Sequence, residues 1–502
     1  MKWSNIGELS PKKQAEKTTP EALVFASAST AARAVSRGEV TSLGLTKAIL
    51  RRVEAYNPKL NAIITLLEKE ALAAAKRADE AVRRGEDLGP LHGVPVTVKD
   101  CFEMKGVRTT AGITSLADYI PQQDSAPVER LRAAGAVIIG HTNIPEMAAD
   151  WQSYNSLFGT TNNPWDLKLT PGGSTGGGAA ALASGLTFLE VGSDVGGSIR
   201  VPAHFCGLFG HKPSIGAVSA RGHVPPVPGS PVGEPAFSVA GPMARSADDL
   251  RLAMEILGGT DGETAKAFTW RLLPPRRSKL TEYRLGYLID DPLCRVSSEV
   301  KEPLTMMVEA LKNAGVEVVE GWPNGIDPKR LFEDYRYIRY ASGAASLSGS
   351  QIYELLKAER VSDGSDEYAA AHAYVSSVKE FQDALWRRAQ AREAWREYFR
   401  GVDAFLMPPA FVPAFPHDHR TPLKSRVLQT PEGPRRYQEL RFWISFATLC
   451  GLPATVAPVG STVGGLPVGV QILGPYLEDA TTIDVAGKLA EIIGGFKAPP
   501  GY

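Results

Sequence analysis

Short apolar runs and amphipathic stretches alternate along most of the chain. Residues 94–100 alternate apolar and polar positions with a period of two, which predicts a strand that ends at Lys99. Residues 136–142 form an apolar run typical of a buried strand, and residues 124–135 before it begin like a helix, with Ser and Pro in the first turn. Strands and helices that alternate at this spacing predict an α/β fold, with a large mixed sheet flanked on both faces by helices.

The longer-range pattern indicates one large domain. Residues 328–400 are almost all helical in pattern and rich in aromatic residues and arginine, and we interpret them as a helical layer that covers a pocket. Residues 259–282 are the best candidate for a linker. We expect the domain to span residues 21–502, preceded by a poorly ordered arm over residues 1–20.

Composition and charge exclude several classes of function. The 502-residue chain carries 55 basic and 55 acidic residues, so its formal net charge is zero, which argues against a nucleic-acid partner. The N-terminal stretch is polar, and no run of about 18 apolar residues occurs, so we expect no secretory signal, no membrane partner and a cytoplasmic location. The 4 cysteines are scattered without a CxxC pair and predict reduced, buried thiols. The His417-Asp418-His419 run has no evident further ligand and is interpreted as a polar loop, so we expect neither a metal nor a cofactor.

The stretch from residue 170 to residue 200 holds two serines flanked by glycines, Ser174 and Ser198. Glycine allows tight turns and leaves backbone N–H groups free, and such groups can bind a developing oxyanion beside a nucleophilic hydroxyl. Residues 172–176 match the G-x-S-x-G pattern of an α/β-hydrolase esterase that would use Ser174, but a poor strand with a proline precedes them. A phosphate-binding loop is disfavoured, because no GxxxxGK[ST] occurs and no GxGxxG follows a strand. The third interpretation joins both serines to Lys99.

This third interpretation rests on several long motifs in a fixed order. They are HGVPVTVKD around Lys99, TPGGSTGGGAAALASG around Ser174 and GSDVGGSIRVPAHFCGLFGHKPS around Ser198, followed by GPMARSADDL, FATLCGLPATVAPVG and GLPVGVQILG. In these motifs and their spacing the chain resembles the amidase signature family, whose members hydrolyse amides with a Ser–cisSer–Lys triad. The resemblance is clearest over residues 85–250 and 440–490, and it implies that residues 85–250 form the catalytic core.

The resemblance implies a role for each member of the triad. Ser198 would be the nucleophile, Ser174 the bridging serine after a cis peptide bond from Gly173, and Lys99 the general base. Where the family commonly has a second serine after the bridging one, this chain has Thr175, which keeps the hydroxyl. Backbone N–H groups at and just before the nucleophile would form the oxyanion hole, from Val195, Gly196, Gly197 and Ser198.

The chemistry of the triad is coherent without the family. A serine hydroxyl is a weak nucleophile until a neighbouring base takes its proton. Burial lowers the pKa of a lysine ammonium because the charged form loses solvation, so Lys99 at the end of a buried strand would be neutral. Lys99 would then draw a proton from Ser174, which draws one from Ser198, and the reverse relay would protonate the leaving amine.

These inferences predict a serine amidohydrolase that forms an acyl-enzyme on Ser198 and releases a carboxylate from a small-molecule amide, with side activity on esters or carbamates. The supply of aromatic residues suggests an aryl or apolar acyl amide as the substrate. Residues expected to line the pocket or bind the substrate are Gly172, Gly173, Met147, Trp151 and Phe158. Two further alternatives stay open, namely the A subunit of a glutamyl-tRNA amidotransferase, which works with partner subunits, and a non-catalytic binding protein that keeps the fold. The family also implies a homodimer.

Overall fold

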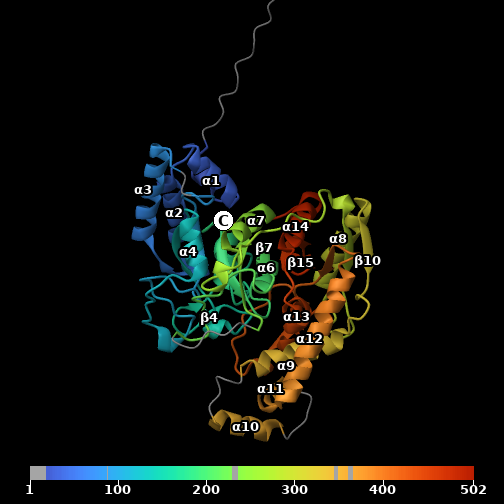
Figure 1. Cartoon of the computed structure of the whole chain (residues 1–502). Helices are drawn as coiled ribbons and strands as arrows, with labels where there is room; N and C mark the ends of the chain where they lie inside the picture. The colour runs from blue at the N-terminus through green and yellow to red at the C-terminus, as the bar shows by residue number, and fades with distance from the viewer. Residues whose placement is uncertain (1–17, 87–88, 229–235, 344–348, 360–365) are drawn as a thin grey trace, which may run out of the picture.

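The computed structural model describes residues 18–86, 89–228, 236–343, 349–359 and 366–502, and within them the chain forms an 11-stranded sheet at the centre of the molecule (Figure 1). In spatial order the strands are β1 (Ile63–Leu66), β3 (Val137–Thr142), β2 (Pro95–Lys99), β6 (Glu190–Asp194), β8 (Val239–Ala244), β7 (Phe209–Lys212), β14 (Ala454–Ser461), β15 (Pro467–Leu473), β11 (Ala404–Met407), β9 (Arg284–Tyr287) and β10 (Glu317–Glu320). β2 runs parallel to β3 and β6, and β9 runs parallel to β10 and β11. The other neighbours are antiparallel, so the predicted mixed sheet is confirmed.

Helices surround this sheet, and two short ribbons lie outside it. The α-helices of the described residues are α1 (Ala28–Ser36), α2 (Ser42–Leu60), α3 (Glu68–Arg84), α4 (Ala126–Ala133), α5 (Gly176–Ala183), α6 (Arg200–Cys206), α7 (Ala247–Leu257), α8 (Ser298–Asn313), α9 (Pro328–Ala341), α10 (Gly349–Glu359), α11 (Asp366–Val375), α12 (Val378–Tyr398), α13 (Arg441–Cys450) and α14 (Asp479–Ile493). The ribbons are β4 (Tyr154–Asn155) with β5 (Gly159–Thr160), and β12 (Val427–Thr430) with β13 (Gly433–Arg436).

Adjacent residues of β14 show that helices cover both faces of the sheet. The Thr455 hydroxyl donates a hydrogen bond to Thr482 of α14 over 2.8 Å. The next residue, Val456, packs in a cluster with Ala179 of α5 and Ala203 of α6. Successive side chains of a strand point to opposite faces, so α14 covers one face while α5 and α6 cover the other. The predicted flanking of both faces is confirmed.

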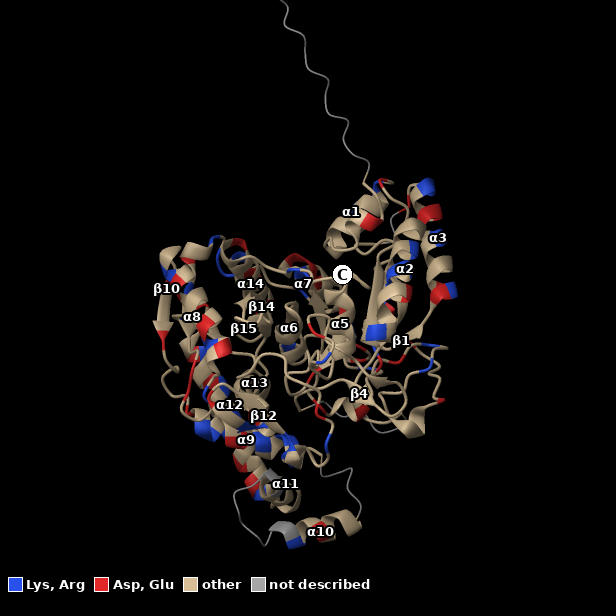
Figure 2. Ribbon diagram, turned by 180° about the vertical axis from the view of Figure 1, so that it is seen from behind, with Lys and Arg blue, Asp and Glu red and all other residues tan. Residues whose placement is uncertain are grey.

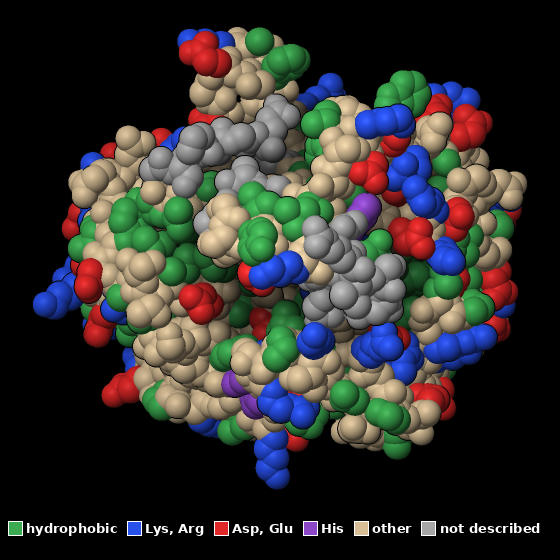
Figure 3. Space-filling model, turned by 90° about the horizontal axis from the view of Figure 1, so that it is seen from below, with side chains coloured by type: hydrophobic (Ala, Val, Ile, Leu, Met, Phe, Trp, Pro, Cys, Tyr) green, Lys and Arg blue, Asp and Glu red, His purple; other side chains and the backbone are tan. Residues whose placement is uncertain are grey.

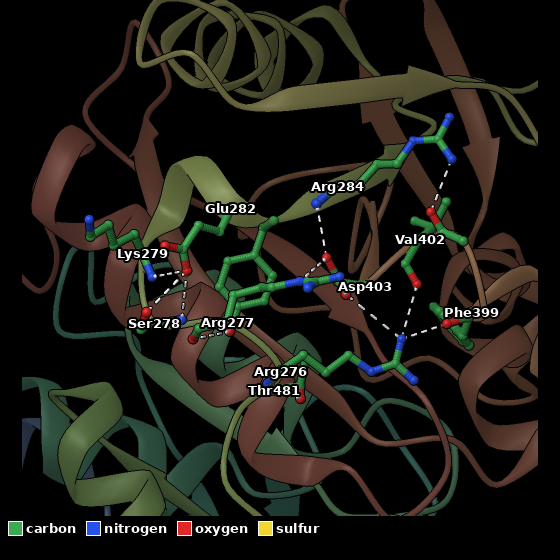
Figure 4. Close-up of polar contacts among 12 residues, drawn as sticks. Arg276, Arg277, Ser278, Lys279, Glu282, Arg284, Phe399, Val402, Asp403 and Thr481 are labelled. Atoms are coloured by element: carbon green, nitrogen blue, oxygen red, sulfur yellow. Dashed lines mark hydrogen bonds and ion pairs between the residues drawn. The ribbon is translucent and has the colours of Figure 1, made fainter.

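The linker candidate over residues 259–282 is bound to the body of the domain. Arg276 Nη2 donates to Glu478 Oε1 over 2.8 Å. Arg277 Nε donates to Asp403 Oδ2 over 3.2 Å (Figure 4). Because the sheet also continues from β7 through β14 to β9, this segment connects two parts of one domain. Most of the predicted arm over residues 1–20 lies outside the described residues.

The described parts of residues 328–400 form α9 to α12. These helices lie at the lower end of the molecule, and basic and acidic residues occur along them (Figures 1 and 2). The face seen from below mixes acidic and basic side chains, as a net charge of zero suggests (Figure 3). Among the described helices, none combines the length and the apolar character that crossing a membrane requires.

Candidate active site

Two parallel neighbouring strands bring the predicted triad to one edge of the sheet. β2 ends at Lys99, and β6 ends at Asp194 beside it. The carboxyl ends of parallel strands lie at the same edge, where the chain turns into loops that can carry a site. The loop over residues 195–199 follows β6 and holds Ser198, while Ser174 lies just before α5.

Lys99 is wholly buried and contacts two hydroxyl groups. Its Nζ donates to Ser174 Oγ over 2.6 Å and to Ser193 Oγ over 3.0 Å. Burial lowers the pKa of Lys99, while neighbouring groups that include Asp194 and Glu190 oppose this shift. The environment therefore favours the neutral amine, which is the form of lysine that can accept a proton.

The two glycine-flanked serines differ in access to the pocket. Ser174 is wholly buried and follows a cis peptide bond from Gly173, as the family resemblance implies. Ser198 is 9% exposed and lines a pocket of about 50 Å³. The backbone N–H of Thr175 donates to the Ser198 carbonyl over 3.1 Å, which ties the two segments together. Within the described chain the Ser198 hydroxyl makes no hydrogen bond, so it is free to meet a ligand.

A buried ion pair holds the loop that carries Ser198. The Asp194 carboxylate accepts the N–H groups of Gly197 over 2.9 Å and of Ile199 over 3.1 Å. The Arg200 guanidinium donates to both oxygens of the same carboxylate, over 2.8 and 3.0 Å. Burial alone would raise the pKa of Asp194, but Arg200 and the backbone N–H groups reverse the shift and lower this pKa to about 2. The carboxylate thus stays ionised and fixes the backbone on both sides of Ser198.

This ion pair corrects the predicted oxyanion hole. The N–H of Gly197 is already used by Asp194, so it is removed from the predicted set. The N–H groups of Val195, Gly196 and Ser198 donate to no group in the described residues and are the remaining candidates.

The pocket beside Ser198 is built from distant parts of the chain. Trp151 lies in its wall, and its Nε1 donates to the Gly196 carbonyl over 2.7 Å. The remaining wall comes from the segment before Trp151, the loop after β6, and helices α9 and α13. The lining residues are Ala148, Ala149, Asp150, Trp151, Val195, Gly196, Ser198, Tyr335, Arg339 and Arg441.

Of the residues predicted to contact substrate, only Trp151 lines this pocket. Met147 is 43% exposed, and its neighbours Ala148 and Ala149 supply the wall in its place. Gly173 packs behind the wall, because a Cβ there would lie only 2.6 Å from the backbone oxygen of Asp150. The other two predicted residues also lie elsewhere, Gly172 against Pro202 and Phe158 against the Arg108 guanidinium.

Comparison with known proteins agrees with this geometry. A family model for amidases matches residues 44–483. The chain belongs to the amidase signature family, and it is an amidohydrolase.

Curated relatives and solved structures match this amidase over nearly its whole length. The A subunit of the glutamyl-tRNA(Gln) amidotransferase of Carboxydothermus hydrogenoformans is 31% identical, over 95% of this chain and 99% of the relative. Fatty-acid amide hydrolase 2-A of Danio rerio is 30% identical, over 95% of this chain and 90% of the relative. A crystal structure of an amidase is 30% identical with a TM-score of 0.75, over 93% of this chain and 100% of that one. The family resemblance drawn from the sequence motifs is therefore confirmed.

Other polar candidates in this amidase have structural partners. His204 is buried, its Nδ1 accepts from the N–H of Gly469 over 2.8 Å, and burial lowers its pKa to about 4. His211 Nε2 lies 3.0 Å from the Asp479 carboxylate, far along the chain. Both histidines hold strands and helices together. In the predicted polar loop, Asp418 pairs with Arg420, and among the described residues no cluster of three or more His, Cys, Asp or Glu is arranged for a metal ion.

Several site residues escaped prediction from sequence. Asp194 and Arg200 flank the nucleophile inside a run of small and apolar residues, and charged residues in such a run are a usable signal for a buried pair. Ser193 had no distinguishing pattern. Tyr335 and Arg441 reach the pocket from helices remote in sequence, which no local pattern reveals.

Proposed function

We propose that this amidase hydrolyses a small-molecule carboxylic amide through an acyl-enzyme on Ser198, with Ser174 as the bridging serine and Lys99 as the base. The observation that carries this proposal is the 2.6 Å hydrogen bond between buried Lys99 and buried Ser174, next to a serine that opens into a pocket. A lysine rather than a histidine is the partner of Ser174, which disfavours the esterase alternative.

The relay accounts for acylation. Ser198 Oγ attacks the carbonyl carbon while its proton passes to Ser174, and the Ser174 proton passes to Lys99 Nζ. The negative charge on the carbonyl oxygen is stabilised by the backbone N–H groups of Val195, Gly196 and Ser198. The proton then returns along the same route to the leaving nitrogen, and the C–N bond breaks.

Deacylation uses the same groups in the same order. Water takes the place of the amine, gives a proton to the relay and attacks the ester carbon of the acyl-enzyme. The C–O bond to Ser198 breaks, Ser198 recovers its proton, and the carboxylic acid leaves. Esters and carbamates can form the same intermediate, because attack at the carbonyl does not require a nitrogen leaving group.

A second candidate function is that of one component of an amidotransferase, which would release ammonia for a partner. The relatives that are A subunits of glutamyl-tRNA(Gln) amidotransferases, at 31% identity in one case, favour it. The two functions share the acylation step, so they are separated by whether the purified chain turns over simple amides without added partner proteins.

Mass spectrometry of the intact protein after treatment with a fluorophosphonate probe tests the nucleophile. We expect one adduct on the wild type, none on Ser198→Ala, and strongly slowed labelling of Lys99→Ala. Ser461→Ala, at an exposed serine of β14, is the matched control and should label like the wild type. Labelling of Ser198→Ala together with loss of labelling in Ser174→Ala would contradict Ser198 as the nucleophile and support the esterase alternative, which uses Ser174. An unlabelled wild type would contradict the acyl-enzyme proposal and favour a non-catalytic role.

A further inference from the structure

Two arginines and a tyrosine open into the same small pocket as Ser198. Tyr335 and Arg339 lie four residues apart on α9, and Arg441 is the first residue of α13. Side chains four apart on a helix lie on the same face, so α9 directs both of its residues to the pocket.

Tyr335 carries a donor with no acceptor among the residues that the structure describes. The residue is wholly buried, and its hydroxyl has no hydrogen-bond partner among the described residues. This hydroxyl lies 3.3 Å from the position that a Cβ on Gly196 would take, which places it against the loop before Ser198. Burial raises the pKa of Tyr335, although Arg339 and Arg441 act to lower it, so the phenol is protonated at neutral pH. A buried donor of this kind is normally satisfied, and the pocket that it faces can admit a ligand group as its partner.

The carboxylates near the pocket are already engaged. Asp150 forms an ion pair with Arg426 over 2.6 Å and also accepts from the hydroxyls of Tyr437 and Tyr154. Asp194 is engaged by the guanidinium of Arg200, as described above. Among the described residues, these two carboxylates are therefore engaged by partners other than Arg339.

The two pocket arginines have aromatic neighbours. Arg339 makes no ion pair with a described residue, and its guanidinium lies 5.3 Å from the centre of the Tyr340 ring. The Arg441 guanidinium lies 5.2 Å from the centre of the Trp151 ring, in the pocket wall. Contact with a ring face leaves the edge of the Arg339 guanidinium able to donate to an anion. The pocket thus combines the charge of Arg339 with a neutral donor from Tyr335, and Arg441 lies beside them in its wall.

We propose that Tyr335 and Arg339 form a subsite for a carboxylate group carried by the amide substrate. This proposal rests on the proposed function, because it takes Ser198 in the same pocket as the nucleophile. Guanidinium groups bind carboxylates through paired, charge-assisted hydrogen bonds, and the Tyr335 hydroxyl adds a third donor. A pocket of about 50 Å³ places this carboxylate only a few bonds from the scissile carbonyl. The substrate class is therefore a short half-amide, in which one molecule carries both an amide and a free carboxylate.

Protection of Ser198 from a neutral fluorophosphonate tests this subsite. The protecting compounds are the half-amides of malonic, succinic and glutaric acid, each compared with its neutral diamide. We expect at least one half-amide to protect the wild type at a concentration about tenfold lower than its diamide, which corresponds to about 1.4 kcal/mol. Added salt should reduce this preference, because it screens charge.

Three variants assign the preference to named residues. The measured ratio is the protecting concentration of the diamide divided by that of the half-amide. Tyr335→Phe and Arg339→Met should each reduce this ratio by several-fold, with protection measured against the unprotected labelling rate of the same variant. Arg330→Met is the control, because Arg330 lies on the same helix but pairs with Glu333 and Asp334. It should keep the wild-type ratio.

The outcomes separate this proposal from the proposed function. If Ser198 is labelled but no half-amide protects better than its diamide, the carboxylate subsite is wrong and the acyl-enzyme proposal stands. If Arg330→Met lowers the ratio as much as Arg339→Met, general surface charge explains the preference and the assignment is wrong. If the wild type is not labelled at all, the proposed function itself fails.

Discussion

Replacement of Arg200 by methionine is the sharpest test of how the nucleophile loop is held. The guanidinium makes five side-chain hydrogen bonds in a fully buried site. Two go to Asp194, and the others reach the Ile444 carbonyl, the Gln471 side chain and the Thr448 hydroxyl. Methionine fills much of the same volume but donates nothing, so the Asp194 carboxylate is left buried without its counter-charge.

Two effects contribute to the loss, and their sizes differ. The pKa of Asp194 falls from an ordinary 3.8 to about 2 in the folded protein, which corresponds to about 2 kcal/mol of stability. Removal of one partner of a buried ion pair destabilises by about 3–5 kcal/mol, because an uncompensated charge stays buried. The second effect dominates, so we expect the free energy of unfolding of Arg200→Met to fall by about 3–5 kcal/mol, a large part of the about 5–15 kcal/mol typical of proteins.

The pH dependence has a definite sign. The pKa of Asp194 is lower in the folded than in the unfolded protein, so its contribution to stability is present above pH 3.8 and is lost as the pH falls toward 2. The difference in the free energy of unfolding between the wild type and Arg200→Met should therefore shrink as the pH falls from 3.8 toward 2. Near neutral pH the full difference should be observed.

Equilibrium urea unfolding, followed by tryptophan fluorescence, measures the effect, and the fluorophosphonate labelling rate reports on the loop. The double variant Asp194→Asn/Arg200→Met should be more stable than Arg200→Met, because it removes the unpaired charge. Arg251→Met breaks the exposed pair with Glu255 and should change stability by less than about 0.5 kcal/mol. If Arg200→Met stays within about 1 kcal/mol of the wild type and labels at the same rate, the ion pair does not hold the loop.

Three further predictions concern the surroundings of Lys99 and Ser174. Burial raises the pKa of Glu190 to about 7, so above that pH its carboxylate is ionised and raises the pKa of Lys99. Glu190→Gln removes this charge and should move the acid limb of the pH profile of labelling to lower pH. A move to higher pH would contradict the assignment of Lys99 as the base. Ser193→Ala removes one of the two hydroxyl partners of Lys99. It should slow labelling roughly fivefold, which corresponds to about 1 kcal/mol in the activation free energy. An unchanged rate would show that Ser174 alone positions the amine. Gly173→Ala should lower the free energy of unfolding by about 1–3 kcal/mol, because its Cβ would meet backbone atoms of residues 150–152 at 2.6–2.7 Å. Gly401→Ala is the control, since the nearest atom to its Cβ lies at 3.6 Å, and it should cost far less stability in the same urea assay.

The sequence alone determined the parts of this protein that depend on local pattern. The strand that ends at Lys99 follows from a period of two, and the helical character of residues 328–400 follows from composition and spacing. The two serines were recognisable because they lie in glycine-rich motifs that can be read directly from the sequence. The family followed from the order of those motifs, so the reaction class could be predicted before the fold was known.

Tertiary structure alone decided which groups from distant helices surround Ser198. Tyr335 and Arg441 reach the pocket from helices far along the chain, and only the packing of α9 and α13 brings them there. The same packing left Met147 exposed and gave the pocket wall to its neighbours. The Asp194 carboxylate accepts the N–H of Gly197, because a buried charge is costly unless it is paired and hydrogen-bonded. Local periodicity reports how a segment folds, but the contents of a pocket depend on contacts between segments, and those exist only once the whole chain has packed.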